Sequence, residues 1–238
     1  MSLVSLESLI KNKVYLGHSK SKWHPRIAFF TRAVVRSHYL IDLVQTAKLL
    51  STAYTYLFKM AKRGHKFLFV GTKAVASPWT KRAAVCCGSF YVNQVWRSGL
   101  LTNWTFLRGR VRLLSWFNRV FLWLQKRDSL KALPKGLVLS LERRYTKLSL
   151  EMSGLVGLHS VPNIIIIVDP EHEKQAILES IKLRRILVGI TDSASHVNSI
   201  HMPVPANDDS SLSVKTVLQI LSTAILRGKL VRYYVGSL

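Results

Sequence analysis

Apolar side chains recur with the period of a helix along residues 43–61. Asp42 is a suitable helix N-cap, and after it apolar residues return every three or four positions until Gly64. This spacing predicts an amphipathic helix. The apolar run at residues 66–70 is stopped by Gly71 and predicts a buried strand. A second helix and a second strand are expected at residues 74–87 and 89–93.

The second half of the chain repeats this alternation. Residues 163–168 form an unbroken run of mostly Ile, which is typical of a strand covered on both faces. Strands that alternate with helices favour an α/β fold, with an open, mostly parallel sheet, helices on both faces and right-handed crossovers. The other expected elements are helices at 171–183 and 213–227 and strands at 186–190 and 201–205.

A different kind of segment separates the two halves. Residues 105–152 contain no strand candidate and are rich in Arg, Lys, Leu and Trp. Pro134 and Gly136 end and restart helices, so residues 131–136 predict the turn of an inserted helical hairpin that projects from the sheet. The expected parts are a basic N-terminal segment with the first half of the α/β domain, the hairpin, and the second half, at residues 1–104, 105–152 and 153–238.

The net charge of +23 lies entirely in the first 150 residues. This part holds 27 Lys and Arg against four acids, whereas residues 151–238 hold eight of each. An excess of this size repels itself in a compact chain unless a polyanion neutralises it. Nucleic acid and an acidic membrane face are the available polyanions, and we expect RNA.

The apolar content, 48% of residues, predicts a folded core but no stable membrane insertion. A spanning helix needs roughly 18 consecutive apolar residues, whereas the best candidate, residues 113–124, contains Asn118 and Arg119. Residues 1–12 are too short and too weakly charged for a secretory or organellar presequence. We expect a chain that is already processed or is made in the compartment where it works.

Residues that follow the predicted strands are the natural place for a ligand in a doubly wound sheet. Gly71-Thr72-Lys73 follows the first strand but lacks the glycine spacing of a nucleotide-binding loop, so we expect a tight turn. Four aspartates also fall at strand ends, and their neighbours favour helix capping over Mg²⁺ binding or acid–base chemistry. These are Asp169, Asp192, Asp208 and Asp209.

Other reactive side chains lack the partners that chemistry needs. Cys86 and Cys87 are adjacent, which suits neither a disulfide framework nor a zinc site, and we expect both to be buried on a helix. His18 and His24 have no Cys or acid close in sequence to complete a metal site. No serine stands in a nucleophile elbow. We therefore expect no catalytic residue, no metal and no cofactor.

Basic residues interleaved with aromatic residues are the positive sign of function. They gather at residues 20–39 and 96–112, where cations can pair with phosphates and rings can stack on unpaired bases. The alternative is that Phe29, Phe30 and Trp104 are core residues and the charges are merely solvated. The candidate RNA-binding residues are Lys20, Lys22, Trp23, His24, Arg26, Arg32, Arg36, Lys73, Arg97, Asn103, Arg108, Arg110 and Arg112.

Several short motifs together resemble the small-subunit ribosomal protein S2 family of bacteria and organelles. They occur in the order of the family and span nearly the whole chain. The motifs are Leu16-Gly17-His18, Trp23-His24-Pro25, Ile41-Asp42-Leu43 with Thr46, LFVGTK at 68–73, Val92-Asn93, Trp96 with GLLTNW at 99–104, LPK at 133–135, VDPEHE at 168–173 with Ala176-Ile177, and PANDD at 205–209.

The resemblance implies a flavodoxin-like sheet with a protruding helical hairpin, and a structural protein rather than an enzyme. It implies a place on the back of the small subunit where head meets body. The implied partners are small-subunit rRNA and neighbouring ribosomal proteins, with no small-molecule substrate.

The chain departs from the family at several motif positions. Its hairpin is basic and rich in Trp where the bacterial hairpin is acidic. These departures favour a divergent organellar ribosome, and we expect one in the mitochondrial matrix rather than in a chloroplast. The other divergent positions are His24, Ala74, Gln94, Val95 and Ser98.

Two other classes of protein stay open on the residues alone. A peripheral membrane protein would lay residues 106–124 on an anionic leaflet, but Arg112 and Arg119 interrupt the apolar residues of that helix. A nucleotide-binding α/β enzyme would use the same sheet, but the phosphate-loop glycines are missing. On the ribosomal interpretation, four aromatic residues pack on another ribosomal protein or on the return helix of the hairpin. They are Trp116, Phe117, Phe121 and Trp123.

Overall fold

The centre of the molecule is a sheet of five parallel strands. The computed structural model describes residues 5–19, 29–126, 134–193 and 199–236. The strands in spatial order are β5 (Phe90–Val92), β4 (Phe67–Val70), β6 (Ile164–Val168), β7 (Ile186–Thr191) and β8 (Met202–Pro205). Numbered along the chain within this sheet, the order is 2-1-3-4-5, which is the flavodoxin-like arrangement of a doubly wound fold. The predicted fold class is confirmed.

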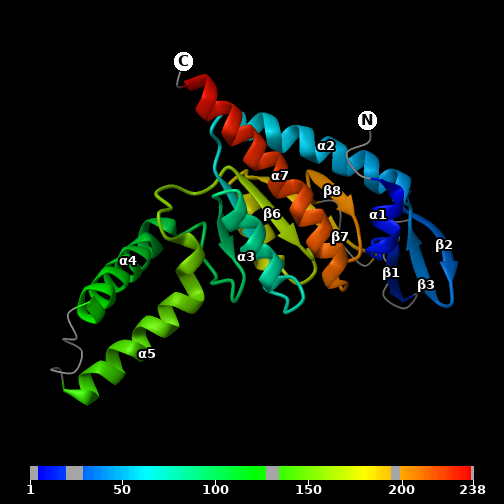
Figure 1. Ribbon diagram of the computed structural model, residues 1–238. Coiled ribbons are helices and arrows are strands. Elements are labelled where there is room, and N and C mark those ends of the chain that lie inside the picture. Colours follow the sequence, from blue (N-terminus) through cyan, green and yellow to red (C-terminus); the bar gives the residue numbers. More distant parts are fainter. Residues whose placement is uncertain (1–4, 20–28, 127–133, 194–198, 237–238) are drawn as a thin grey trace.

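Helices cover both faces of this sheet (Figure 1). Side chains of a strand alternate between the faces, so Phe67 and Phe69 join one core and Leu68 and Val70 join the other. This two-sided burial explains why the strands read as unbroken apolar runs. The helices of the first face are α2 (Leu43–Lys62), α3 (Ser77–Cys86) and α7 (Ser211–Gly236), and those of the second are α6 (Lys174–Lys182) and the base of the hairpin.

α2 and α7 pack closely because a glycine lies between their backbones. A Cβ on Gly228 would lie 2.5 Å from the carbonyl oxygen of Phe58 and 2.6 Å from the Cβ of Ala61. Glycine often marks the end of a helix, but here it serves the contact with α2. The helix therefore continues to Gly236, beyond the predicted end at residue 227.

A helical hairpin projects from the sheet (Figure 1). It consists of α4 (Trp104–Lys126) and α5 (Lys135–Met152), and the short 3-10 helix η4 (Ser153–Leu155) leads from it back to the sheet. Near the sheet, Leu107, Val111 and Leu114 of α4 are buried in the second core. No helix within the described ranges is long and apolar enough to cross a membrane.

Aromatic rings join the outer parts of the two hairpin helices. The ring centroids of Phe117 and Phe121 lie 6.4 and 5.0 Å from that of Tyr145 on α5. The prediction that the α4 aromatics pack on the return helix is therefore confirmed for these two residues. Trp116 and Trp123 remain 49% and 52% exposed.

The N-terminal region holds a small sheet that the sequence did not predict. After α1 (Leu6–Lys11), the strands β1 (Leu16–Ser19), β2 (Thr31–Val35) and β3 (His38–Ile41) pair antiparallel in the order β1-β3-β2. β2 and β3 are joined by Arg36 and Ser37, whose φ angles are +46° and +66°. A two-residue turn of this kind normally carries Asn or Gly. Because this turn carries Arg and Ser, the sequence contains no signal for a β-hairpin here.

One further local expectation is wrong in part, and one alternative is decided residue by residue. Cys87 is buried as predicted, but Cys86 is exposed, because α3 turns Ala83, Ala84 and Cys87 toward the core. Among the aromatics considered for the core, Trp104 is 6% exposed, whereas Phe29 is 83% exposed.

Candidate nucleic-acid interface

The carboxyl ends of the parallel strands meet in a cluster of ionised side chains. Lys73 Nζ, beyond β4, lies 2.9 Å from Asp169 Oδ2, beyond β6, and 2.7 Å from Asp209 Oδ1, beyond β8. His18 of β1 places Nδ1 2.9 Å from Asp192 Oδ2 and Nε2 3.2 Å from Asp209 Oδ2. The edge at which doubly wound proteins bind their ligands is therefore occupied by ion pairs of the chain itself.

Burial strongly perturbs the titration of this cluster. Asp208 is 2% exposed, and its Oδ1 lies 3.5 Å from Lys73 Nζ. Burial, together with the charges of Asp169 and Asp192, raises the pKa of Asp208 to about 7. Burial acts to lower the pKa of Lys73, but its hydrogen bonds to Asp209 and Asp169 and the charge of Asp208 outweigh this effect and raise that pKa above its usual value.

The prediction that the strand-end aspartates cap helices is right only in that Asp169 caps the turn that leads into α6; the N-cap residue of α6 itself, Glu173, makes no side-chain capping bond. Asp169 Oδ1 accepts hydrogen bonds from the N–H groups of Glu171 and His172, both at 3.2 Å. Before α7, however, it is Asn207 Oδ1 that accepts hydrogen bonds from the backbone, from the N–H groups of Asp209 and Ser210 at 2.8 and 2.9 Å. The other three aspartates direct carboxylate oxygens into the ion-pair cluster instead.

Three ligand atoms of the cluster lie close enough to hold a metal ion. They belong to His18, Asp208 and Asp209 and lie within 4.8 Å of one another. The ammonium group of Lys73 already supplies positive charge to both aspartates. No acid lies close to His18 in the sequence, but the fold brings Asp192 and Asp209 to it from the far end of the chain.

Two buried glutamates fix the loops of the same edge. Glu173, just before α6, accepts from both the backbone N–H and the hydroxyl of Thr72 at 2.6 Å. Glu179 within α6 accepts from the indole N–H of Trp96 at 3.0 Å and from three backbone N–H groups of residues 99–102 at 2.8 to 3.2 Å. The loops that carry the GTK and GLLTNW motifs are therefore held by carboxylates of the α6 segment.

A third glutamate ties the hairpin to the same region. The side chain of Glu151, near the end of α5, is 8% exposed and pairs with Arg97 and Arg110. The Arg110 contact measures 3.3 Å. This pairing joins the loop before α4, α4 itself and α5, so it fixes the base of the hairpin.

The structure describes eight of the thirteen predicted RNA-binding residues, and they fall into two groups. Arg32, Arg36, Arg108 and Arg112 are exposed arginines, and no carboxylate of the described residues pairs with them. Asn103 is exposed just before α4. The cations paired within the chain are Lys73, Arg97 and Arg110. The candidates outside the described residues are Lys20, Lys22, Trp23, His24 and Arg26.

Sequence reasoning missed the three buried glutamates. The sequence pattern of α6 could have indicated Glu179, because this residue lies on the same buried face of the helix as Ala176, Ile177 and Ser180. An acid on the buried face of an amphipathic helix needs hydrogen-bond donors or cations in the interior of the protein. Which donors it meets is not encoded locally, since they lie about 80 residues upstream.

The fold and its surface define a structural α/β protein whose ligand edge is filled by internal ion pairs and whose surface carries exposed cations, among them Arg108 and Arg112 on the projecting hairpin. A family model described as "Ribosomal protein S2" matches residues 9–228. The chain belongs to this family. It is therefore a structural constituent of the small ribosomal subunit and not an enzyme.

Individual relatives agree with this assignment. Small ribosomal subunit protein uS2c of Emiliania huxleyi is 38% identical over 229 residues, which cover 96% of this chain and 98% of that protein. Small ribosomal subunit protein uS2 of Nostoc punctiforme is 36% identical, with 96% and 85% covered. The uS2c protein of Cyanophora paradoxa is 35% identical over 228 residues, with 96% of each chain covered.

Replacing Glu179 by Gln should destabilise the loop at residues 96–102. The carboxylate of Glu179 accepts hydrogen bonds at both oxygens, whereas a glutamine amide replaces one oxygen with an N–H₂ group that faces the same N–H donors. We therefore expect the free energy of unfolding to fall by about 2–4 kcal/mol. Urea denaturation of the full chain measures it. Glu142→Gln, at an exposed position on α5, is the control; equal stability of the two variants would contradict the role of Glu179.

The buried carboxyl of Asp208 should make stability fall as pH rises. Its pKa is raised from 3.8 to about 7 in the folded chain, so the folded state favours the protonated carboxyl. The stability of the folded chain is therefore not reduced by Asp208 below about pH 4, and it falls as the pH rises toward 7. The pKa of His18 is also raised, through its hydrogen bond to Asp192, which adds a loss above about pH 6.5.

The substitution Asp208→Asn removes the loss of stability that is due to ionisation of Asp208. Relative to the unsubstituted chain, we expect the variant to gain stability steadily between pH 4 and pH 7, as followed by thermal unfolding across that range. A constant difference between the two proteins at every pH would show that Asp208 does not titrate in this window.

Proposed function

We propose that the basic N-terminal half of the chain and its hairpin bind small-subunit rRNA, while the neutral second half contacts neighbouring ribosomal proteins. The observation that carries this proposal is a set of exposed cations that no carboxylate of the described residues neutralises. Buried acids, by contrast, are engaged within the chain. Phosphates supply the missing negative charge. Among the predicted RNA-binding residues that the structure describes, these cations are Arg32, Arg36, Arg108 and Arg112.

The other candidates complete the proposed interface in different ways. Arg97 and Arg110 are 43% and 35% exposed, so each can meet a phosphate while it pairs with Glu151. Asn103 stands exposed at the start of α4, and Lys73 acts by holding the strand-end loops. The candidates at residues 20–26 enter the proposal from the sequence alone. The place where head meets body, implied by the family resemblance, also belongs to the proposal.

We further propose that the ribosome is that of a chloroplast. The relatives include chloroplast forms, named uS2c, from Emiliania huxleyi and Cyanophora paradoxa, and a cyanobacterial uS2 from Nostoc punctiforme. These relatives support a chloroplast over the mitochondrion that the divergent motifs favoured.

Sucrose-gradient fractionation tests the partner and the organelle together. Lysates of purified chloroplasts and of mitochondria are run with and without ribonuclease, and the chain is detected by mass spectrometry. We expect it with the chloroplast small subunit, and we expect that co-migration to disappear on digestion. Recovery from mitochondrial subunits alone would overturn the choice of organelle, and co-migration that survives complete rRNA digestion would overturn the role of rRNA.

Binding to rRNA should depend steeply on salt. If about 6–10 cations meet phosphates, the affinity of the full chain for small-subunit rRNA falls about 10³- to 10⁵-fold between roughly 50 and 200 mM salt. Replacing both Arg32 and Arg36 by Gln should reduce the slope of log K against log salt by about two. Lys182→Gln, at an exposed position on α6, should leave the slope unchanged. An affinity that does not change with salt is the contrary result.

An apolar row on α4 supports a protein partner. Phe106, Leu113 and Trp116 are 69%, 45% and 49% exposed, and at about 100° per residue they fall within roughly 80° of the helix circumference. Exposed apolar patches of this kind mark interaction surfaces. In our proposal this row packs on a neighbouring protein of the small subunit.

Replacing Phe106 and Trp116 by Gln should release that neighbour. We expect purified small subunits that carry the variant to contain less of one adjacent protein, measured by quantitative mass spectrometry, and the isolated chain to become more soluble. Val85→Gln, which changes an apolar residue of α3 that is 62% exposed, is the matched control. Subunits of unchanged protein composition would count against the proposed contact.

A further inference from the structure

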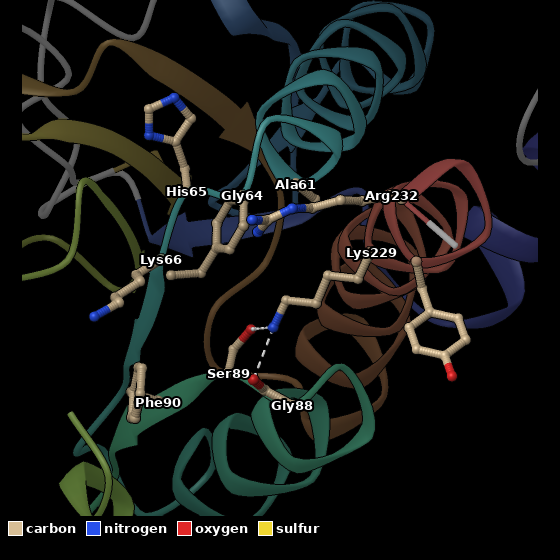
Figure 2. Close-up of a pocket in the computed structure, with 12 residues that line it drawn as sticks. Ala61, Gly64, His65, Lys66, Gly88, Ser89, Phe90, Lys229 and Arg232 are labelled. Carbon is tan, nitrogen blue, oxygen red and sulfur yellow. Dashed lines mark hydrogen bonds between the residues drawn. The ribbon is translucent and has the colours of Figure 1, made fainter. Parts of the chain in front are cut away.

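A large cavity at the amino ends of β4 and β5 is lined by several cations, of which Lys229 serves the fold itself. Its volume is about 620 Å³, and its lining includes Lys229 and Arg232 of α7. Figure 2 shows Lys229 reaching toward the loop that follows α3, where its Nζ lies 2.8 and 2.7 Å from the carbonyl oxygens of Cys87 and Gly88. A cation at the carboxyl end of a helix stabilises the carbonyls there. The charge of Lys229 is therefore explained without a ligand.

A smaller cleft lies between α4 and the loop at residues 156–160. Its volume is about 150 Å³, which is below the roughly 300–1,000 Å³ of pockets that bind small organic molecules. It corresponds to about five water molecules at ~30 Å³ each. The cleft therefore fits a single phosphate group but not a whole nucleotide. Its lining residues are Arg108, Val111, Arg112, Ser115, Gly157, Leu158 and His159.

The cleft is built on buried anchors. Val111 and Leu158 are 4% and 5% exposed and belong to the second core. The indole N–H of Trp104 donates to the carbonyl oxygen of His159 at 3.4 Å, which ties the loop to α4. Gly157 has φ +83°, a conformation that favours glycine. The two walls are thus held in place whether or not a ligand is present.

The cleft is positively charged, and none of the residues that line it is an acid that could balance this charge. Arg108 and Arg112 stand one helical turn apart, a spacing at which like charges repel by about 0.2–0.5 kcal/mol. Both are exposed, and the lining contains no acid. Unlike Lys229, neither has a helix end to stabilise. An anion between them would relieve the repulsion and accept charge-assisted hydrogen bonds from two guanidinium groups.

We infer that this cleft seats one phosphate of the rRNA backbone, held jointly by Arg108 and Arg112 with His159 on the opposite wall. The inference rests on the proposed rRNA binding and adds that these side chains act on the same phosphate. It also adds His159, which the sequence did not single out. Two arginines on one phosphate act as a unit, so removal of the second should cost little once the first is gone.

A double-mutant cycle tests this sharing. The affinity of the full chain for a transcript of the complete small-subunit rRNA is measured by filter binding over a range of salt. We expect Arg108→Gln and Arg112→Gln each to weaken binding about tenfold, as for one charge-assisted contact. The double variant should be little weaker than either single variant, and its salt slope should fall by about one, as for one lost phosphate. His159→Gln should weaken binding in the same direction.

Lys182→Gln, which removes an exposed cation of α6 outside the cleft and outside the proposed rRNA-binding half, is the matched control, and thermal unfolding checks that all variants fold. Losses that multiply in the double variant would place the two arginines on different phosphates and overturn the inference. Variants indistinguishable from Lys182→Gln would do the same. If the unsubstituted chain itself fails to bind rRNA, the proposed function fails instead, so the two failures are distinct.

Inorganic phosphate alone serves as the second probe. Calorimetric titration of the full chain should show no saturable binding, because the cleft needs the rest of the RNA contacts for affinity. Saturable binding that disappears in the Arg108→Gln/Arg112→Gln variant would assign the cleft to free phosphate and overturn its assignment to rRNA.

Discussion

The burial of the parallel sheet on both faces is the constraint on which the rest of the structure depends. Parallel strands need helical crossovers, and these cover the sheet on each side. The apolar residues of β4 and β6 are consequently divided between two cores, and polar chemistry is left to the two ends of the strands. At the carboxyl end, Lys73 and the strand-end aspartates neutralise one another.

The same constraint decides where the positive charge of the chain goes. Acids are few, and three glutamates with little exposed side chain fix loops: Glu173 holds the turn after β4, Glu179 holds the loop before α4, and Glu151 holds the base of the hairpin. The excess of Lys and Arg has no room in the cores and lies on the surface, both on the helices that cover the sheet and on the projecting hairpin. A protein of the small ribosomal subunit thereby gains a rigid body and cationic surfaces directed outward.

The accuracy of sequence reasoning differed between kinds of element. The strands at residues 67–70 and 164–168 were predictable because a strand buried on both faces is uniformly apolar. The strands of the N-terminal sheet were missed because β2 is largely exposed and its turn uses Arg36 and Ser37 rather than Asn and Gly. Cys86 was placed wrongly because a one-residue step on a helix changes the face by about 100°.

By itself, the sequence determined the class of fold, the inserted hairpin, the family and the surplus of cations, because periodicity, motif order and charge are properties of neighbouring residues. Only the tertiary structure decided which cations are free. Lys73 meets Asp169 across 96 residues, and Glu179 meets Trp96 across 83. Pairing at such separations is set by the crossovers of the sheet, so a basic residue that looked available in the sequence is committed within the folded chain, while Arg108 and Arg112 remain exposed.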